Sequence, residues 1–173
     1  MQNRFCCLSR LAALASPIKK FQAIKIRPAK EEEIETLLEF EKAIIETERP
    51  FDSTFKDEEI HYYDLLELIR SPGSEVMVAE INGQLVGSGY AQIRKADPFL
   101  KHTHFAYLGF MYVKPAFRGK GINQSLLEAL LSWAKAKGIS EIRLDVYDEN
   151  IVAKNAYLKS GFRPILVTMR RRI

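Results

Sequence analysis

A short basic turn with two glycines, Arg118-Gly119-Lys120-Gly121, separates two segments of different periodicity. The apolar and aromatic run before it, Tyr107–Val113, predicts a buried strand, which ends near Pro115 because proline cannot donate to a strand ladder. From Ile122 onward, apolar residues recur at helical spacing. The first N–H groups of a helix have no partner within it, and the helix dipole makes this end positive. Such a turn can be a plain connector, or it can bind a phosphate or pyrophosphate.

Two familiar nucleotide-binding patterns do not describe this turn. The pattern GxxxxGK[ST] is absent, and GxGxxG fails because position 124 is glutamine. If the turn binds an anion, it does so without either of these signatures.

The turn resembles motif A of the GNAT superfamily of N-acetyltransferases, [QR]-x-x-G-x-[GA] following a strand. Residues 118–123 read Arg, Gly, Lys, Gly, Ile and Asn, so Asn123 stands where glycine or alanine is usual and its side chain must point away from the phosphates. In that family the turn holds the pyrophosphate of acetyl-CoA through backbone amides. A second stretch, NIVAKNAYLKSGF at 150–162, looks like motif B of the same family. It matches at Asn150, Ala153, Tyr157, Lys159, Gly161 and Phe162.

The resemblance covers about residues 22–173 and implies an N-acetyltransferase. It would move an acetyl group from acetyl-CoA to a primary amine of a small molecule or peptide by direct attack. Tyr157 would be the general acid that protonates the leaving thiolate. The residues implied in acetyl-CoA binding are Met111, Tyr112, Val113, Arg118, Gly119, Lys120, Gly121, Ile122, Asn123, Asn150 and Asn155. The alternative is a non-catalytic acyl-CoA-binding or regulatory module on the same fold.

Neither the general base nor the acceptor is fixed by the sequence. A base acting directly or through water would help to deprotonate the amine, and the open choices are Glu80, His104, Tyr107, Asp145 or water alone. Three carboxylates after the first expected helix could hold a cationic amine or simply be solvated: Glu46, Glu48 and Asp52. Nearby aromatic residues could wall an apolar pocket or belong to the core: Phe51, Phe55, Tyr62 and Tyr63.

The surrounding pattern predicts an α/β (α+β) domain at residues 22–173. Strands are expected at 23–27, 75–81, 84–94, 103–113, 140–147 and 162–173, with helices at 30–47, 57–70, 122–137 and 151–160. Asn82-Gly83 predicts a type I′ hairpin turn. The hairpin is antiparallel, whereas the strand–helix–strand unit around the basic turn is a parallel crossover. We therefore expect a mixed sheet with about four helices, and the resemblance implies that it is a GNAT-like, splayed central sheet of six to seven strands.

Composition narrows the class of protein further. Four of the 26 basic residues lie in residues 1–22, which leaves 22 basic against 22 acidic residues, so a nucleic-acid-binding body is not indicated. No apolar run approaches the ~20 residues that span a bilayer, so no membrane contact is expected. Cys6 and Cys7 are adjacent, so they predict free thiols and a cytoplasmic location, and no cluster indicates a metal site.

Two expectations concern the assembly of the protein. Residues 1–21 are expected to be a flexible extension outside the fold, and a basic-tail interaction protein is a third, weaker reading that rests on this segment alone. Two copies could form a homodimer through an exposed edge strand.

Overall fold

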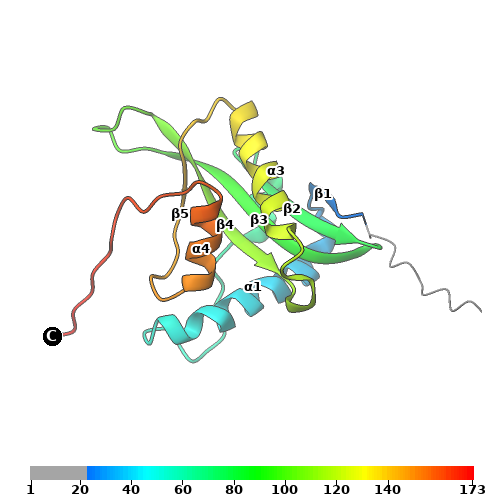
Figure 1. The fold of residues 1–173 in the computed structure, drawn as a ribbon, viewed down its shortest axis with the longest axis horizontal. Coiled ribbons are helices and arrows are strands. Elements are labelled where there is room, and N and C mark those ends of the chain that lie inside the picture. Colours follow the sequence, from blue (N-terminus) through cyan, green and yellow to red (C-terminus); the bar gives the residue numbers. More distant parts are fainter. Residues whose placement is uncertain (1–22) are drawn as a thin grey trace, which may run out of the picture.

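The computed structural model describes residues 23–173 and places helices on both faces of a mixed sheet (Figure 1). The expected extension at 1–21 lies outside the described residues. Within them, five strands lie side by side in chain order: β1 Lys25–Pro28, β2 Ser74–Ile81, β3 Gln84–Lys95, β4 His104–Val113 and β5 Ile142–Leu144. Neighbours from β1 to β4 are antiparallel, whereas β4 and β5 are parallel. The mixed sheet is confirmed.

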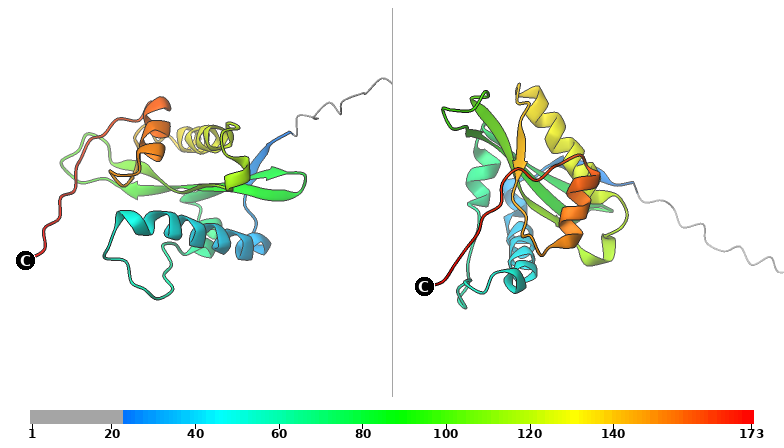
Figure 2. Two further views of the ribbon diagram at one scale, coloured as in Figure 1. Left: turned by 60° about the horizontal axis from the view of Figure 1, so that its bottom comes forward. Right: turned by 60° about the vertical axis from the view of Figure 1, so that its left-hand side comes forward.

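Four α-helices cover the sheet in the described part of the chain: α1 Ile34–Glu48, α2 Leu65–Arg70, α3 Ile122–Ala136 and α4 Ile151–Lys159. Short 3₁₀ turns precede α1 at Glu31–Glu33, follow it at Arg49–Phe51 and precede α3 at Pro115–Phe117. The helices α1 and α2 lie on one face, and α3 and α4 lie on the other (Figure 2). Strand β4 therefore runs between two helical layers.

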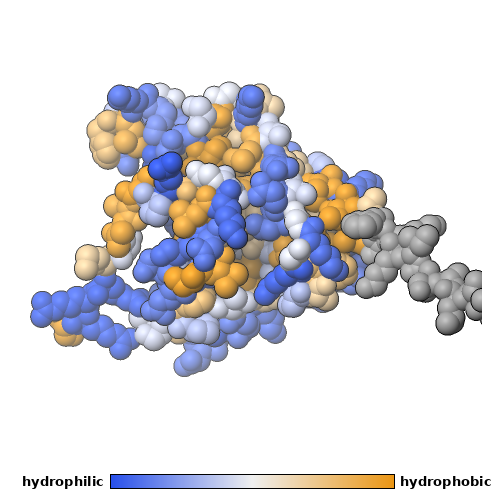
Figure 3. All heavy atoms as spheres, in the orientation of Figure 1, coloured by the Kyte–Doolittle hydropathy of each residue, from blue (hydrophilic) through white to orange (hydrophobic). Residues whose placement is uncertain are grey.

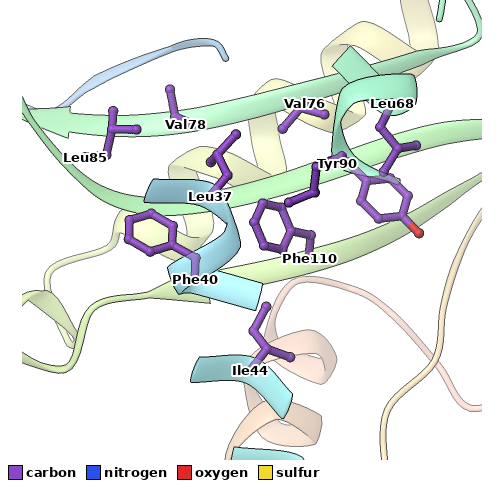
Figure 4. Close-up of a cluster of buried hydrophobic side chains, with 10 residues drawn as sticks. Leu37, Phe40, Ile44, Leu68, Val76, Val78, Leu85, Tyr90 and Phe110 are labelled. Atoms are coloured by element: carbon purple, nitrogen blue, oxygen red, sulfur yellow. The ribbon is translucent and has the colours of Figure 1, made fainter. Parts of the chain in front are cut away.

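Both faces of the sheet are packed. On the α1 face, Leu37, Phe40 and Ile44 meet side chains of β2, β3 and β4, among them Phe110 (Figure 4). On the α3 face, the fully buried Leu126, Leu127 and Leu130 cover the sheet. Each such side chain contributes about 1.5–3 kcal/mol by burial. The helix that follows the basic turn is therefore firmly held.

The β2–β3 hairpin forms as the sequence predicts. Asn82 and Gly83 have φ values of 52° and 77°, the two positive values that a type I′ turn requires. Along β2, Val76 and Val78 enter the α1-side core, whereas Ala79 and Ile81 enter the α3-side core. Side chains of β2 thus pack into the cores on both faces of the sheet, as expected for a strand covered on both faces.

The prediction for residues 57–70 was wrong in its first half, because only Leu65–Arg70 is helical. The Asp64 side chain accepts from the Glu67 N–H at 2.9 Å and caps the helix at its true start. Upstream, the N–H groups of Tyr62 and Tyr63 donate to the Glu41 carboxylate at 2.7 and 2.9 Å. These backbone groups are satisfied by a side chain, so they need no helix.

The prediction of six to seven strands was also wrong, since residues 23–173 form five. Strand β5 has only three residues, and no strand forms at 162–173, where residues 163–173 are exposed. A strand needs a neighbour for its backbone groups, and this segment stands apart from the sheet. Apolar residues lie exposed along it (Figure 3): Ile165, Leu166, Val167, Met169 and Ile173.

Candidate active site

The turn between β4 and α3 presents a row of backbone donors. Gly119 and Gly121 have φ values of 74° and 78°, and no atom lies within 4 Å of where a side chain would begin. None of the N–H groups of residues 119–124 donates to an acceptor in the described chain. A left-handed glycine directly before a helix turns such donors outward together. The turn therefore has the geometry and the potential to hold an anion.

The side chains of the turn leave this row open. The Arg118 Nε donates to the Val113 carbonyl at 3.0 Å and fastens the turn to the end of β4. The Lys120 ammonium donates to the Ala116 carbonyl at 3.3 Å and lies 5.0 Å from the centre of the Phe117 ring. Ile122, the first residue of α3, is buried against the sheet, and Asn123 is half-buried. The Arg118 and Lys120 side chains thus brace the turn, while the backbone supplies the donors.

Strands β4 and β5 diverge close to this turn. Their last paired residues are Leu108 and Leu144, so Met111–Val113 have no β5 partner. On the other side these residues still run along β3, where Tyr112 pairs with Ser88 and Val113 with Gly87. No residue of β5 therefore occupies the backbone groups of Met111–Val113, although the Val113 carbonyl accepts from Arg118.

A bulge in β4 marks the point of divergence. Phe110 has a φ of 57°, a left-handed conformation that costs a bulky residue of order 1–3 kcal/mol. Its N–H donates to the Tyr63 hydroxyl at 3.3 Å, and its carbonyl accepts from the buried Ser88 hydroxyl at 3.1 Å. Side chains thus satisfy groups that the bulge removes from the ladder.

Helix α4 carries Tyr157 to the same region. The Ser160 hydroxyl donates to the side-chain oxygen of Gln124 at 2.8 Å, so the end of α4 is tied to the first turn of α3. Tyr157 is partly buried, and this burial, together with the Glu48 carboxylate, raises its pKa to about 12. Glu48 belongs to α1 on the opposite face, so the two helical layers come within electrostatic range of each other here.

The two asparagines of α4 differ in their surroundings. The Asn150 side chain accepts from the Ala153 N–H at 3.1 Å, and so it caps the helix. Asn155 is exposed. Asn150 retains its amide NH₂ group for another partner, so capping is compatible with its predicted role.

A clamp built on Glu41 positions the loop on the α1 face. The Glu41 side chain is only 1% exposed, and it accepts the two backbone bonds from Tyr62 and Tyr63 as well as contacting His61 Nδ1 at 2.8 Å. Glu41 fixes Tyr63, whose hydroxyl in turn receives the Phe110 N–H. The α1–α2 loop is thereby connected to the β4 bulge.

The four residues considered as the base lie in different settings. The Glu80 carboxylate is paired with Arg27 on β1 at 2.7 Å, and His104 is exposed at the start of β4 beside Thr103. The Tyr107 hydroxyl donates to Asp145 at 3.0 Å. The Arg94 guanidinium stacks 3.7 Å from the centre of the Tyr107 ring. Only Tyr107 and Asp145 are brought together.

Sequence reasoning missed two residues of this region, Glu41 and Tyr147. Glu41 had a usable signal, because it falls on the apolar face of α1, between Leu37 and Ile44. Tyr147 lies in what looked like a continuous strand, and its contacts with Phe51 and Phe55 depend on the chain leaving the sheet after Leu144. No local sequence pattern predicts that β5 ends at Leu144.

Two further kinds of site were sought in residues 23–173. No group of three or more His, Cys, Asp or Glu side chains there could hold a metal ion. None of the helices in this range combines the length and apolar character needed to cross a bilayer.

Known proteins resemble this chain in sequence and in fold. The profile of the acetyltransferase (GNAT) family matches residues 37–162. The chain is 28% identical over 98 residues to an aminoglycoside N(6')-acetyltransferase type 1 of Stenotrophomonas maltophilia, a match that covers 55% of this chain and 63% of that protein. The matched region spans less than two thirds of the length of the curated relatives it matches.

Solved structures share the fold. A tetramutant of the BH1408 protein from Bacillus halodurans superposes with a TM-score of 0.78 at 22% identity, covering 86% of this chain and 99% of that one. A predicted acetyltransferase from Clostridium acetobutylicum, solved with acetyl-CoA, gives 0.70 at 22% identity, covering 87% and 96%. The chain belongs to the acetyltransferase (GNAT) family, and the predicted membership of this family is confirmed.

Proposed function

We propose that this protein transfers an acetyl group from acetyl-CoA to a primary amine of a small molecule or peptide by direct attack. One observation supports this most strongly. The bond between Ser160 and Gln124 ties the end of α4, the helix that carries Tyr157, to the first turn of α3, which begins at the amide-lined turn. The proposed anion site and the proposed acid are thus carried by two helices in direct contact.

The described residues fit acetyl-CoA. The N–H groups of residues 119–124 would hold its pyrophosphate, with Arg118 and Lys120 keeping the turn in shape. Backbone groups of Met111–Val113 that neither β3 nor Arg118 occupies would bind the pantetheine arm, and an N–H there would stabilise the oxyanion that forms during attack. Asn150 and Asn155, at the side of α4, would contact the pantetheine or phosphate end.

The reaction sets two tasks for the protein. The amine nitrogen forms a bond to the thioester carbonyl carbon, the carbon–sulfur bond breaks, and the amine proton must leave. The thiolate then takes a proton, which Tyr157 would supply. With a pKa raised to about 12, the Tyr157 hydroxyl stays protonated at neutral pH and has a proton to donate. Asp145, directly or through the Tyr107 hydroxyl that donates to it, or water would accept the amine proton.

The non-catalytic module is not favoured, because the relatives are named as acetyltransferases. The relatives' names make aminoglycosides one class of acceptor to assay, alongside polyamines, amino acids and peptide N-termini. A cytoplasmic location and a homodimer through an edge strand complete the proposal. Strand β5, which forms an edge of the sheet, is the natural place for such pairing.

The test is thermal unfolding with and without saturating acetyl-CoA, with free thiol assayed against amines in the same samples. A ligand at 100 times its Kd stabilises by about 2.7 kcal/mol. For a domain of this size the midpoint should rise by roughly 5–10 °C. A rise with thiol release for one amine class is the expected result. A rise without release for any amine would favour the binding module, and no rise would contradict the proposed donor site.

A further inference from the structure

Packing on both faces of the sheet fixes where the bulge in β4 lies. Between two regular pairs, β3 has the single residue Gly89, whereas β4 has two residues, Phe110 and Met111. Such an extra residue shifts the alternation of side chains by one position. Leu108 accordingly packs against α3, whereas Phe110, two residues further along, packs into the core on the α1 face (Figure 4). The place of the bulge therefore depends on these apolar contacts.

Two hydroxyl groups hold the backbone on either side of Phe110. The peptide group before it carries the Phe110 N–H, which donates to the Tyr63 hydroxyl at 3.3 Å. The peptide group after it carries the Phe110 carbonyl, which accepts from the Ser88 hydroxyl at 3.1 Å. Ser88 is fully buried on β3, and Tyr63 is anchored because its own N–H donates to the Glu41 carboxylate at 2.9 Å. These hydroxyls fix the direction of both peptide groups.

The bond from Ser88 also determines where the Met111 N–H points. The peptide between Phe110 and Met111 is trans and planar, so its carbonyl and its N–H point in opposite directions. The Phe110 carbonyl accepts from a residue of β3. The Met111 N–H is therefore directed away from β3, toward the side of β4 where β5 has already ended.

The ladder between β3 and β4 gives the same direction independently. The Lys114 N–H donates to the Val86 carbonyl at 2.8 Å. In an antiparallel ladder every second residue directs its backbone groups toward the partner strand, so Tyr112 also faces β3. Met111 alternates with Tyr112 and faces the other way. The last residue of β4 that pairs with β5 is Leu108, so no residue of β5 occupies the Met111 N–H.

We propose that Ser88 and Tyr63 are positioning residues for acetyl transfer, and that they aim the Met111 N–H at the thioester oxygen. This inference rests on the proposed function, which assigns an N–H of Met111–Val113 to the oxyanion. Phe110 is strained in its left-handed conformation, so its peptide groups stay there only while partners hold them. A hydrogen bond weakens steeply when its donor is misdirected, and an oxyanion donor acts only when it is well aimed.

Steady-state kinetics with acetyl-CoA and an accepted amine test this role. Ser88→Ala should lower kcat by about tenfold, a part of the effect of deleting an oxyanion donor. The KM for acetyl-CoA should change by less than about twofold, because the lost alignment matters mainly in the transition state. Tyr63→Phe acts from a different element and should lower kcat in the same way, but less. Ser88→Thr keeps a hydroxyl on the same β-carbon and should retain most of the wild-type kcat.

Tyr90→Phe is the matched control. Tyr90 is buried two residues after Ser88 on β3, and its ring centre lies 5.3 Å from that of Tyr63. Its hydroxyl bonds neither peptide group of Phe110, so this variant should keep the wild-type kcat. A merely structural role for Ser88 and Tyr63 would lower the unfolding midpoint and leave the kcat of the folded protein unchanged. Wild-type kcat in both Ser88→Ala and Tyr63→Phe, or an equal fall in Tyr90→Phe, would overturn the inference.

An NMR measurement tests the same alignment without turnover. Acetyl-CoA and CoA differ only by the acetyl group, whose carbonyl can accept from the Met111 N–H. Replacing CoA by acetyl-CoA should therefore move the Met111 amide proton downfield in wild type and in Tyr90→Phe. The change should be smaller in Ser88→Ala and in Tyr63→Phe. The absence of an acetyl-dependent change at Met111 in wild type would overturn the inference.

The two measurements separate this inference from the proposed function. An active wild type with equally active Ser88→Ala and Tyr63→Phe would overturn the positioning role and leave the acetyltransferase standing. An acetyl-dependent shift of Met111 that Ser88→Ala abolishes, without thiol release for any amine, would support the positioning role and count against the enzyme.

Discussion

The β4–α3 turn and the α1–α2 loop lie on opposite faces of the sheet (Figure 2), and they are built differently. The turn consists of consecutive backbone groups fixed by the well-packed helix α3. The loop side consists of side chains from three distant segments, held by a clamp on Glu41 and by aromatic contacts. The backbone donors of the turn are therefore held by a well-packed helix. The side chains of the loop are held by only a few hydrogen bonds and ring contacts.

The largest expected difference is in stability. Leu130→Ala should lower the free energy of unfolding by about 3 kcal/mol, since this side chain is fully buried under α3. Phe55→Ala, on the partly exposed loop, should cost less than about 1 kcal/mol. Urea denaturation measures both. Equal losses would mean that the two sides are equally well anchored.

Tyr157→Phe tests the residue that lies between the two sides. Loss of the proton donor should lower turnover at least tenfold and by about 100-fold if the hydroxyl is the sole acid. The ring and its contact with Phe162 remain, so acetyl-CoA should still raise the unfolding midpoint. Turnover at the wild-type rate would remove Tyr157 from the mechanism.

A matched pair of glycine substitutions separates an effect on acetyl-CoA binding from the effect of backbone strain on stability. Gly121 and Gly138 have φ values of 78° and 75° at the two ends of α3, with open space around each. Changing either to alanine should cost about 1–2 kcal/mol of stability. Only Gly121→Ala should also weaken acetyl-CoA binding, by roughly tenfold, as measured by calorimetric titration. Similar affinity in both variants would argue against the turn as the pyrophosphate site.

The smallest expected effect is a pH dependence confined to the loop side. Contact with Glu41, helped by Glu59, raises the pKa of His61 above its usual 6.5. The protonated form is favoured in the folded state, so its stabilisation is complete below about pH 6.5 and is lost as the pH rises through the folded value. The unfolding midpoint should fall slightly between pH 6 and 8.5, and His61→Gln should reduce that fall. A fall that is identical in the variant would remove His61 as its source.

The sequence predicted features whose causes are local. The Asn82-Gly83 hairpin and the glycine turn before α3 depend on a few adjacent residues, and both lie where they were expected. The strand expected at 162–173 had the right composition, but a strand also needs a neighbour, which composition does not supply. The helix expected from residue 57 failed because Glu41, some twenty residues away, takes the backbone donors of Tyr62 and Tyr63.

The same distinction applies to the site. Residues 118–123 could be identified because the whole of the proposed pyrophosphate-binding turn lies within one short segment. Among Glu46, Glu48 and Asp52 the sequence offered no choice, because the difference lies in Arg49 and Arg170, which occupy two of them. Tyr147 could not be found without knowing that β5 ends after three residues.

The contact between Arg170 and Asp52 affects the order in which parts of the chain are expected to fold. It joins residues 118 positions apart, whereas the β2–β3 hairpin closes through a two-residue turn. Long-range closures are slow because chain entropy is lost before the contact forms. In a refolding experiment we therefore expect amide protection to appear in the hairpin first and around residues 49–64 last. The α1–α2 loop would thus be the last part of the described chain to fold.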